Sequence, residues 1–281
     1  PNFPIGERVK FGPATFLPRY DRRRLLLMSQ NPDTWLTRFH RLGSPPSFYR
    51  LAGILMPFIA VICIALLIAG LYGGLVLAPA DYQQGESYRI IYIHVPSAWM
   101  SMFVYAVLAA TSAISLIWRM KLAEAVARAS APVGAAYTFL ALVTGSLWGK
   151  PMWGTWWVWD ARLTSELILL FLYLGYMALV AAIDDRRTAS RAGAVLAIVG
   201  VVNLPIIHFS VEWWNTLHQG PTVTKFDQPS IAISMLIPLL LMAAAFKFHY
   251  LYTMLARVRV EILDSERRTA WVNALVTSKA S

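Results

Sequence analysis

The chain has 281 residues, of which 57% are hydrophobic and 14% charged, and its formal net charge is +10. Because soluble domains carry about 25% charged residues, this composition excludes an ordinary soluble protein. The single cysteine, Cys63, excludes an intrachain disulfide, a Cys-x-x-Cys-His haem attachment site and a thiolate metal cluster. No Gly-x-x-x-x-Gly-Lys-Ser/Thr loop occurs, so any dependence on ATP would come from a partner.

Six long apolar segments follow residue 50. A bilayer core about 30 Å thick requires about 20 apolar residues in a helix. Alternation is absent, and the segments exceed the roughly 10 residues of a barrel strand, so the sequence predicts an all-α polytopic membrane protein with six transmembrane helices. The predicted spans are 51–77, 98–118, 130–148, 163–183, 192–209 and 230–252.

The basic residues predict the orientation of these spans, because cytoplasmic flanks and short loops collect Lys and Arg. Of the 25 basic residues, 21 lie before the first span, after the second, after the fourth, or in the last turns of the sixth and beyond it. Both termini are therefore expected to be cytoplasmic. The net positive charge is explained by this orientation and by attraction to an anionic lipid bilayer, with no need of nucleic acid.

The spans divide the chain into three predicted regions. Residues 1–50 lack a continuous apolar stretch, so they are expected to be a cytoplasmic extension that is neither a signal peptide nor a span. Met28 is consistent with a native start, which would make residues 1–27 an upstream or non-native extension. Residues 51–252 form the predicted membrane domain, and residues 253–281 a cytoplasmic tail.

Three of the five histidines fall on the predicted outer side of the membrane. His94 precedes the second span, His208 lies at the outer end of the fifth, and His218 lies in the loop after it. His40 and His249 fall on the cytoplasmic side. A lone interfacial histidine is most often a packed residue, so a ligand role is indicated only by what surrounds it.

Tryptophans gather on the same side. Eight of the eleven lie there, whereas a belt of interfacial aromatic residues should populate both faces of the membrane. Four of them occupy one short segment, as Trp153, Trp156, Trp157 and Trp159. If this segment is helical, the first three share one face and form a platform for a flat aromatic ligand.

Two imidazoles on different helices beside an indole platform are what axial coordination of haem iron requires. The predicted axial ligands are His94, with Pro96 in the first turn of its helix, and His208, whose helix Pro205 should kink or open. His218 is the reserve ligand. Zinc is the weaker interpretation, because it needs four converging ligands and no His-x-x-x-His spacing occurs.

Polar residues beside the tryptophans have two possible roles each. Asp160 begins the fourth span, where a carboxylate suits either the helix N-cap or a ligand site. The basic residues on the outer side are candidates for pairing with the two haem propionates, and each is equally explained as an interfacial residue. These candidates are Arg89, Lys150, Arg162 and Lys225.

Residues 148–164 resemble the tryptophan-rich WWD signature of haem-handling membrane proteins used in cytochrome c maturation. The continuation Asp-Ala-Arg-Leu-Thr-Ser-Glu-Leu after Trp159 is similar to the short member, cytochrome c maturation protein C. The larger protein F continues instead with a run like Pro-Val-Glu-Asn. Residues 78–96 and 202–220 are similar to the same family, and the resemblance covers about residues 35–252.

This resemblance implies a concrete role. Proteins of this family bind haem b non-covalently at the periplasmic face of the bacterial inner membrane through two histidines and the tryptophan loop. By position these are His94, His208 and residues 153–160, with Arg162 following. The family transfers haem to a chaperone, protein E, and works with the single-span protein D and the ATP-binding-cassette proteins A and B. The chain itself is therefore not expected to be an enzyme.

Two alternative functions stay open at the level of sequence. A permease for haem or another small molecule would need polar residues within spans and inverted repeats, but Glu166 is the one acid near a span's interior and no half-repeat is visible. A membrane cytochrome would place paired histidines in facing helices at two depths, whereas His40 and His249 lie outside spans or at their ends.

Overall fold

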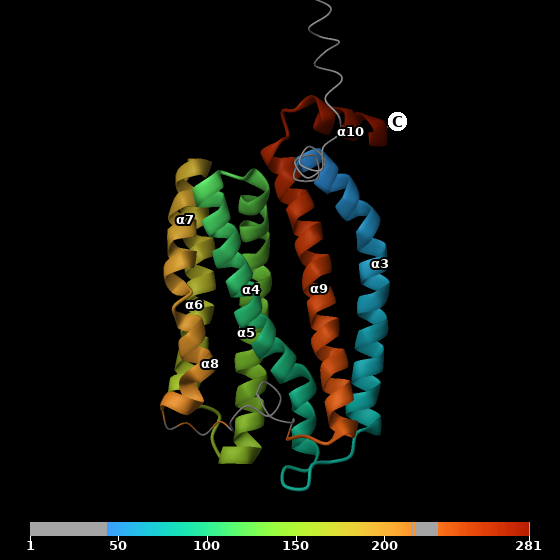
Figure 1. Cartoon of the computed structure of the whole chain (residues 1–281), viewed down its shortest axis with the longest axis vertical. Coiled ribbons are helices and arrows are strands. Elements are labelled where there is room, and N and C mark those ends of the chain that lie inside the picture. The colour runs from blue at the N-terminus through green and yellow to red at the C-terminus, as the bar shows by residue number, and fades with distance from the viewer. Residues whose placement is uncertain (1–43, 215, 217, 219–229, 281) are drawn as a thin grey trace, which may run out of the picture. The chain divides into compact units, whose positions relative to one another are not determined.

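The structure is a computed structural model that describes residues 44–214, 216, 218 and 230–280 (Figure 1). These residues are helical apart from loops, and their only strand-like pairing is one isolated bridge between Asp81 and Gly85. Six helical stretches are long and apolar enough to cross a membrane, which confirms the predicted all-α polytopic fold. The predicted extension 1–27 and the suggested start at Met28 lie outside the described residues.

The helices extend beyond most of the predicted spans. In chain order they are α3 (Pro45–Tyr72), the π-helical turn η1 (Gly73–Leu77), the 3-10 helix η2 (Glu86–Ile90), α4 (Ile91–Trp118), α5 (Lys121–Trp153), α6 (Ala161–Ala182), α7 (Arg186–Gly200), α8 (Asn203–Trp213), α9 (Ile233–Ser265) and α10 (Ala270–Ala280). Two differences concern the site. His94 lies inside the start of α4 rather than before it, and Trp153 is the last residue of α5 rather than part of a loop.

The fifth predicted span is divided into two helices. α7 ends at Gly200 and α8 begins at Asn203, while the amides of Val201 and Val202 bond to carbonyls only three residues back. Pro205 gives the physical reason, because it lacks the N–H that would bond to the Val201 carbonyl and its ring would crowd that carbonyl. The break confirms the predicted distortion at Pro205.

The helices form two connected groups (Figure 1). α3 lies along α9, whereas α4 packs on α5, and α6 packs on α5, α7 and α8. Both α4 and α5 also contact α9, which joins the groups. The tail beyond residue 252 continues the sixth span as helix to Ser265 before α10 begins.

Glycines allow the closest helix contacts. A Cβ on Gly134 of α5 would lie 2.1 Å from the Tyr173 ring of α6, and one on Gly200 of α7 would lie 2.1 Å from the Tyr105 hydroxyl of α4. Nonbonded atoms cannot approach so closely. The two buried tyrosine rings, whose centres are 5.0 Å apart, therefore occupy the middle of the second group because glycine faces them.

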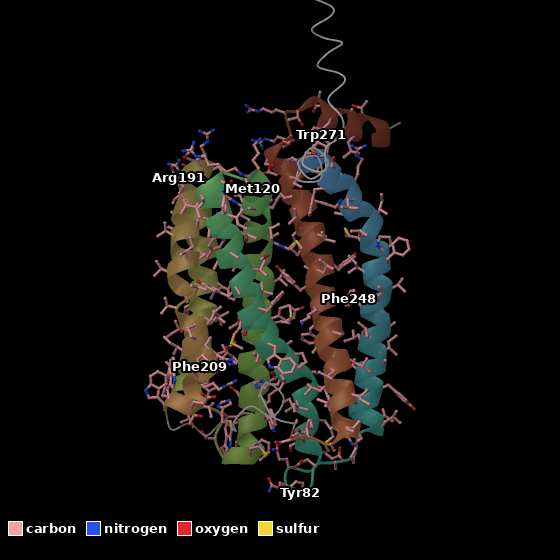
Figure 2. The ribbon with its side chains drawn as sticks, in the orientation of Figure 1. Tyr82, Met120, Arg191, Phe209, Phe248 and Trp271 are labelled. Atoms are coloured by element: carbon pink, nitrogen blue, oxygen red, sulfur yellow. The ribbon has the colours of Figure 1, made fainter. Side chains whose placement is uncertain are left out.

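The bundle has two ends of different chemistry. At the tryptophan end, α5 finishes at Trp153, the loop 154–160 leads into α6, and Tyr82 lies in the first loop (Figure 2). At the arginine end, α4 gives way to α5 around Met120, and α7 begins near Arg191 (Figure 2).

Arg186 links three helices at the arginine end. From the first position of α7, its guanidinium contacts Glu124 of α5 at 3.2 Å, and Glu261 and Asp264 of α9 at 3.4 and 3.3 Å. Single exposed ion pairs contribute little, but one cation shared among three carboxylates constrains the relative depth of the helices. This network sets α5, α7 and α9 in register.

Candidate functional site

His94 lies near the start of α4 with its imidazole against α5. Its Nδ1 is 3.1 Å from the Ala141 carbonyl oxygen and 3.1 Å from Thr144 Oγ1. The Thr144 hydroxyl donates to the Leu140 carbonyl at 2.6 Å, so its oxygen is left to accept. Because a carbonyl can only accept, this geometry assigns the proton to Nδ1, and Nε2 keeps the lone pair that can bind a metal.

Two further residues of α5 hold the His94 ring. Gly145 lets the helices approach so closely that a Cβ there would lie 3.0 Å from His94 Cε1. Trp148 meets the imidazole edge to face, with ring centres 5.6 Å apart. The Trp148 indole N–H donates to Gln84 Oε1 at 2.9 Å, which ties the first loop to α5. His94 is therefore positioned by its surroundings before any ligand binds.

His218 is the second histidine that the structure brings to this region. Its ring packs on Trp153 with centres 5.0 Å apart, and its Nδ1 lies 3.6 Å from Asp160 Oδ2. Asp160 Oδ1 accepts from the Leu163 amide at 2.8 Å, which confirms the cap role suggested for this residue. His94 and His218 thus each pack on a tryptophan of α5, Trp148 and Trp153. With Nδ1 facing a carboxylate, Nε2 of His218 is the atom left for a metal.

His208 has different surroundings. It is exposed on α8, and its ring meets Phe209 edge to face at 4.7 Å (Figure 2 labels Phe209). Phe209 in turn stacks on Trp213 at 5.2 Å. Among the described residues, no hydrogen bond, ion pair or ring contact links His208 to His94 or its neighbours. The contacts thus place His94 and His218 against tryptophans of the same part of α5, whereas those of His208 lie on α8.

The four loop tryptophans do not share a helical face. Gly154 follows Trp153 with a left-handed φ of 74°, and residues 155–160 are not helical. The expected i, i+3, i+4 arrangement is therefore wrong, because the glycine ends α5 before Trp156 is reached.

The loop indoles instead make separate contacts and remain accessible. Trp157 and Trp159 meet edge to face at 5.4 Å, and Lys150 Nζ lies 5.9 Å from the centre of the Trp156 ring. Trp156 and Trp159 are 55% and 74% exposed, whereas Trp153 is half-buried. Exposed aromatic surface concentrated on one short loop is typical of a binding site.

Two of the basic residues that are candidates for pairing with an acidic group of a ligand already have partners within the protein. Arg89 forms an ion pair with Glu86 and donates to the Gly74 carbonyl at 2.7 Å. Lys150 donates to the loop backbone at 3.0 Å, and Lys225 lies outside the described residues.

Arg162 is better placed for such a group. It lies in the first turn of α6, two residues after Asp160 and one turn before Glu166. Glu166 is buried and accepts from Ser101 Oγ at 2.7 Å. Within the described ranges, the Arg162 guanidinium forms no ion pair of 4 Å or less, so its donors remain for a ligand.

An apolar groove of about 360 Å³ lies between α5 and α6 below Trp157, and no histidine lines it. Its α5 side is formed by residues such as Val143 and Ser146, which lie on a different face of the helix from Ala141 and Trp148. The groove is therefore separate from the histidine site.

Sequence reasoning missed the contribution of α5. Ala141, Thr144, Gly145 and Trp148 recur at spacings of three and four residues, which places them on one helix face. This periodicity was the available signal for a shared helix face, but it does not indicate which helix packs against that face.

Comparison with known proteins agrees with these features. Residues 38–273 match the family model described as heme exporter protein C. Heme exporter protein C of Haemophilus influenzae is 53% identical over 241 residues, which cover 86% of this chain and 97% of that protein. The protein of the same name from Escherichia coli K12 is 53% identical over 245 residues, covering 87% and 98%.

The chain belongs to the heme exporter protein C family. This confirms the resemblance that the tryptophan loop indicates. A further relative is a mitochondrial protein of Marchantia polymorpha whose name refers to cytochrome c biosynthesis. It is 46% identical over 200 residues, which cover 71% of this chain and 83% of that protein.

Proposed function

We propose that this protein binds haem at the tryptophan end, between His94 and His218, and passes it on during cytochrome c maturation. The observation that carries the proposal is the shared arrangement of these two imidazoles. His94 donates from Nδ1 to a carbonyl oxygen, and Nδ1 of His218 lies 3.6 Å from a carboxylate oxygen, which leaves Nε2 of each ring for iron. Both rings also pack on tryptophans near the end of α5. Bis-histidine ligation of haem iron requires two such nitrogen ligands. The printed names of the relatives, which refer to heme export and cytochrome c biosynthesis, support this function.

The choice of second ligand rests on geometry. Sequence position favours His208 and keeps His218 in reserve, because His208 lies at the end of a span. The contacts favour the opposite order, since His218 packs on Trp153 and faces Asp160, whereas His208 is exposed on α8. A metal-bound histidine usually has its other nitrogen held by a carboxylate or carbonyl, and the Asp160 carboxylate, 3.6 Å from Nδ1 of His218, is placed for that role.

Each remaining residue of the site has a role toward haem. The exposed rings of Trp156 and Trp159, with Trp157 beside them, offer aromatic surface to the porphyrin. Arg162 supplies donors for a propionate. Asp160 acts by holding His218 and capping α6 rather than by touching haem.

A transfer protein must hold haem without keeping it. Non-covalent binding of haem b by two imidazoles and exposed indoles is reversible, and a site on a loop leaves one haem edge free for an acceptor. We assign this acceptor role to the haem chaperone protein E, and the energy of release to the ATP-binding-cassette proteins A and B. The single-span protein D is a further partner of the complex. We assign the chain itself no enzymatic step.

We also place the tryptophan end on the periplasmic side of the bacterial inner membrane. The connections at the arginine end carry Arg119, Lys121, Arg186 and Arg187, and α9 continues there into a basic tail. Short connections rich in Lys and Arg are retained in the cytoplasm.

The first prediction concerns the axial ligands. Purified in detergent with haem, the wild type should give the optical spectrum of a low-spin six-coordinate haem in the ferric and reduced states. His94→Ala and His218→Ala should each convert it to high spin or lose haem, because one axial nitrogen is removed. The matched variant His208→Ala should keep the wild-type spectrum.

Two outcomes would overturn parts of this scheme. A high-spin His208→Ala variant beside an unchanged His218→Ala variant would restore His208 as the ligand. Unchanged spectra in all three variants would remove bis-histidine haem binding altogether.

The second prediction concerns the support of His94 by α5. In Gly145→Ala the new methyl group would lie 3.0 Å from Cε1, so the imidazole must shift and the low-spin fraction should fall. Gly175→Ala on α6, whose nearest contact would be an ordinary 3.8 Å, is the control and should leave the spectrum unchanged. A wild-type spectrum in Gly145→Ala would show that this contact does not position the ligand.

Thr144 provides a finer test of the same support. Thr144→Val removes one acceptor from Nδ1, which lowers the basicity of the ligand and should raise the reduction potential of the bound haem. Thr144→Ser keeps the hydroxyl and should restore the potential. Equal potentials in all three proteins would contradict the assigned hydrogen bond.

The third prediction concerns orientation. In a Cys63→Ser background, Tyr82→Cys and Met120→Cys place single thiols at opposite ends of the bundle, at positions 91% and 43% exposed (Figure 2). A membrane-impermeant maleimide should label only Tyr82→Cys in intact spheroplasts and both variants after lysis. Labelling of Met120→Cys alone before lysis would reverse the orientation.

A further inference from the structure

An arginine at the arginine end of the bundle lies between two helices and has no acidic partner among the residues that the structure describes. Arg259 of α9 stacks on Tyr49 of α3, with its guanidinium carbon 4.2 Å from the ring centre. Its Nη1 is 3.6 Å from the sulfur of Met56, and its Nε is buried without a hydrogen-bond partner. In the part of the chain that the structure describes, no carboxylate lies within 4 Å of it.

The surface of α3 is shaped to receive this guanidinium. At Gly53 a Cβ would lie 3.4 Å from Nη2, which is van der Waals contact, so the guanidinium lies directly against α3 at this glycine. The Tyr49 ring beneath it also contacts Trp271 of α10, with ring centres 5.8 Å apart (Figure 2 labels Trp271). The Trp271 indole N–H donates to Glu266 at 2.7 Å, which anchors this aromatic pair. The guanidinium is thus held in one orientation.

The acids that follow Arg259 in sequence are engaged elsewhere. Glu261 contacts Arg186, and Glu266 contacts Lys121 at 3.6 Å as well as Trp271. The missing counterion must therefore come from outside this set. Arg259 is half-buried rather than enclosed, so an external anion can reach it.

The depth of Arg259 indicates the source of that anion. It lies two residues before Glu261 of the charged network and opposite the second turn of α3, so it is near the end of the membrane-crossing part of α9. Arginine at such a depth extends its head to the level of the lipid phosphates.

We propose that Arg259 binds the phosphate of an anionic phospholipid at the contact between α3 and α9. A half-buried cation needs an anion to offset its desolvation, and the guanidinium fork matches two phosphate oxygens. Basic sites between transmembrane helices characteristically take anionic headgroups. Because only 11% of the apolar window of α3 is buried within the protein, a lipid bridging α3 and α9 would strengthen the attachment of α3.

The full-length protein in nanodiscs provides the test, with membranes of phosphatidylcholine alone or mixed with phosphatidylglycerol. The wild type should unfold at a higher temperature in the mixed membrane and should retain about one additional phosphatidylglycerol in native mass spectrometry after extraction. Arg259→Gln should lose both effects. Arg257→Gln, which removes the same charge from an exposed position on the same helix, should keep them.

Further variants and a phosphate control distinguish the ways in which the lipid proposal could fail. If Arg259→Gln does not fold, Arg259→Lys is compared with Arg257→Lys, and only the former should show weaker lipid retention, because the bidentate fork is lost. Inorganic phosphate added to the detergent-solubilised protein should not reproduce the stabilisation. Equal retention of phosphatidylglycerol by the wild type and the Arg259 variants, or full stabilisation by inorganic phosphate, would overturn the lipid site.

Discussion

The hydrogen bond from His94 Nδ1 to α5 is the interaction on which the rest of the site depends. Without it the imidazole would exchange tautomers, and neither nitrogen would be reserved for a metal. The bond exists because Thr144 already donates to its own helix and because Gly145 lets α4 and α5 approach. The Trp148 to Gln84 bond extends this support to the first loop. A contact inside the bundle thereby determines which nitrogen of His94 is available to a ligand at the tryptophan end.

The two proposed ligands differ in how they are held, and the difference suits the proposed release of haem. His94 is fixed by helix backbone and packed side chains, whereas His218 is held by Trp153 and Asp160 at the edge of the loop. Asp160 does two things at once, since one oxygen caps α6 and the other faces His218. The helices therefore support His94 rigidly, whereas the support of His218 comes from the tryptophan loop.

The sequence allowed the six spans and the break at Pro205 to be predicted, because bilayer thickness sets the length of an apolar helix and proline removes a specific hydrogen bond. It also located the tryptophan loop and the capping role of Asp160. It ranked His208 ahead of His218 as the second ligand, since hydropathy gives the depth of a residue but not the direction in which its side chain points. The expected indole face failed for a local reason, as Gly154 ends α5. The hydrogen-bond and packing partners of His94 depend on which helices pack together. The periodicity of a single sequence does not determine that packing.

The most direct test of this account is a high-resolution structure of the haem-loaded protein in a lipid nanodisc. The account predicts iron bonded to Nε2 of His94 and Nε2 of His218, with His94 Nδ1 still bonded to α5, Arg162 at a propionate and indoles of the loop against the porphyrin. Iron bonded to His208, iron bonded to His94 through Nδ1, or haem seated in the groove between α5 and α6 would contradict it.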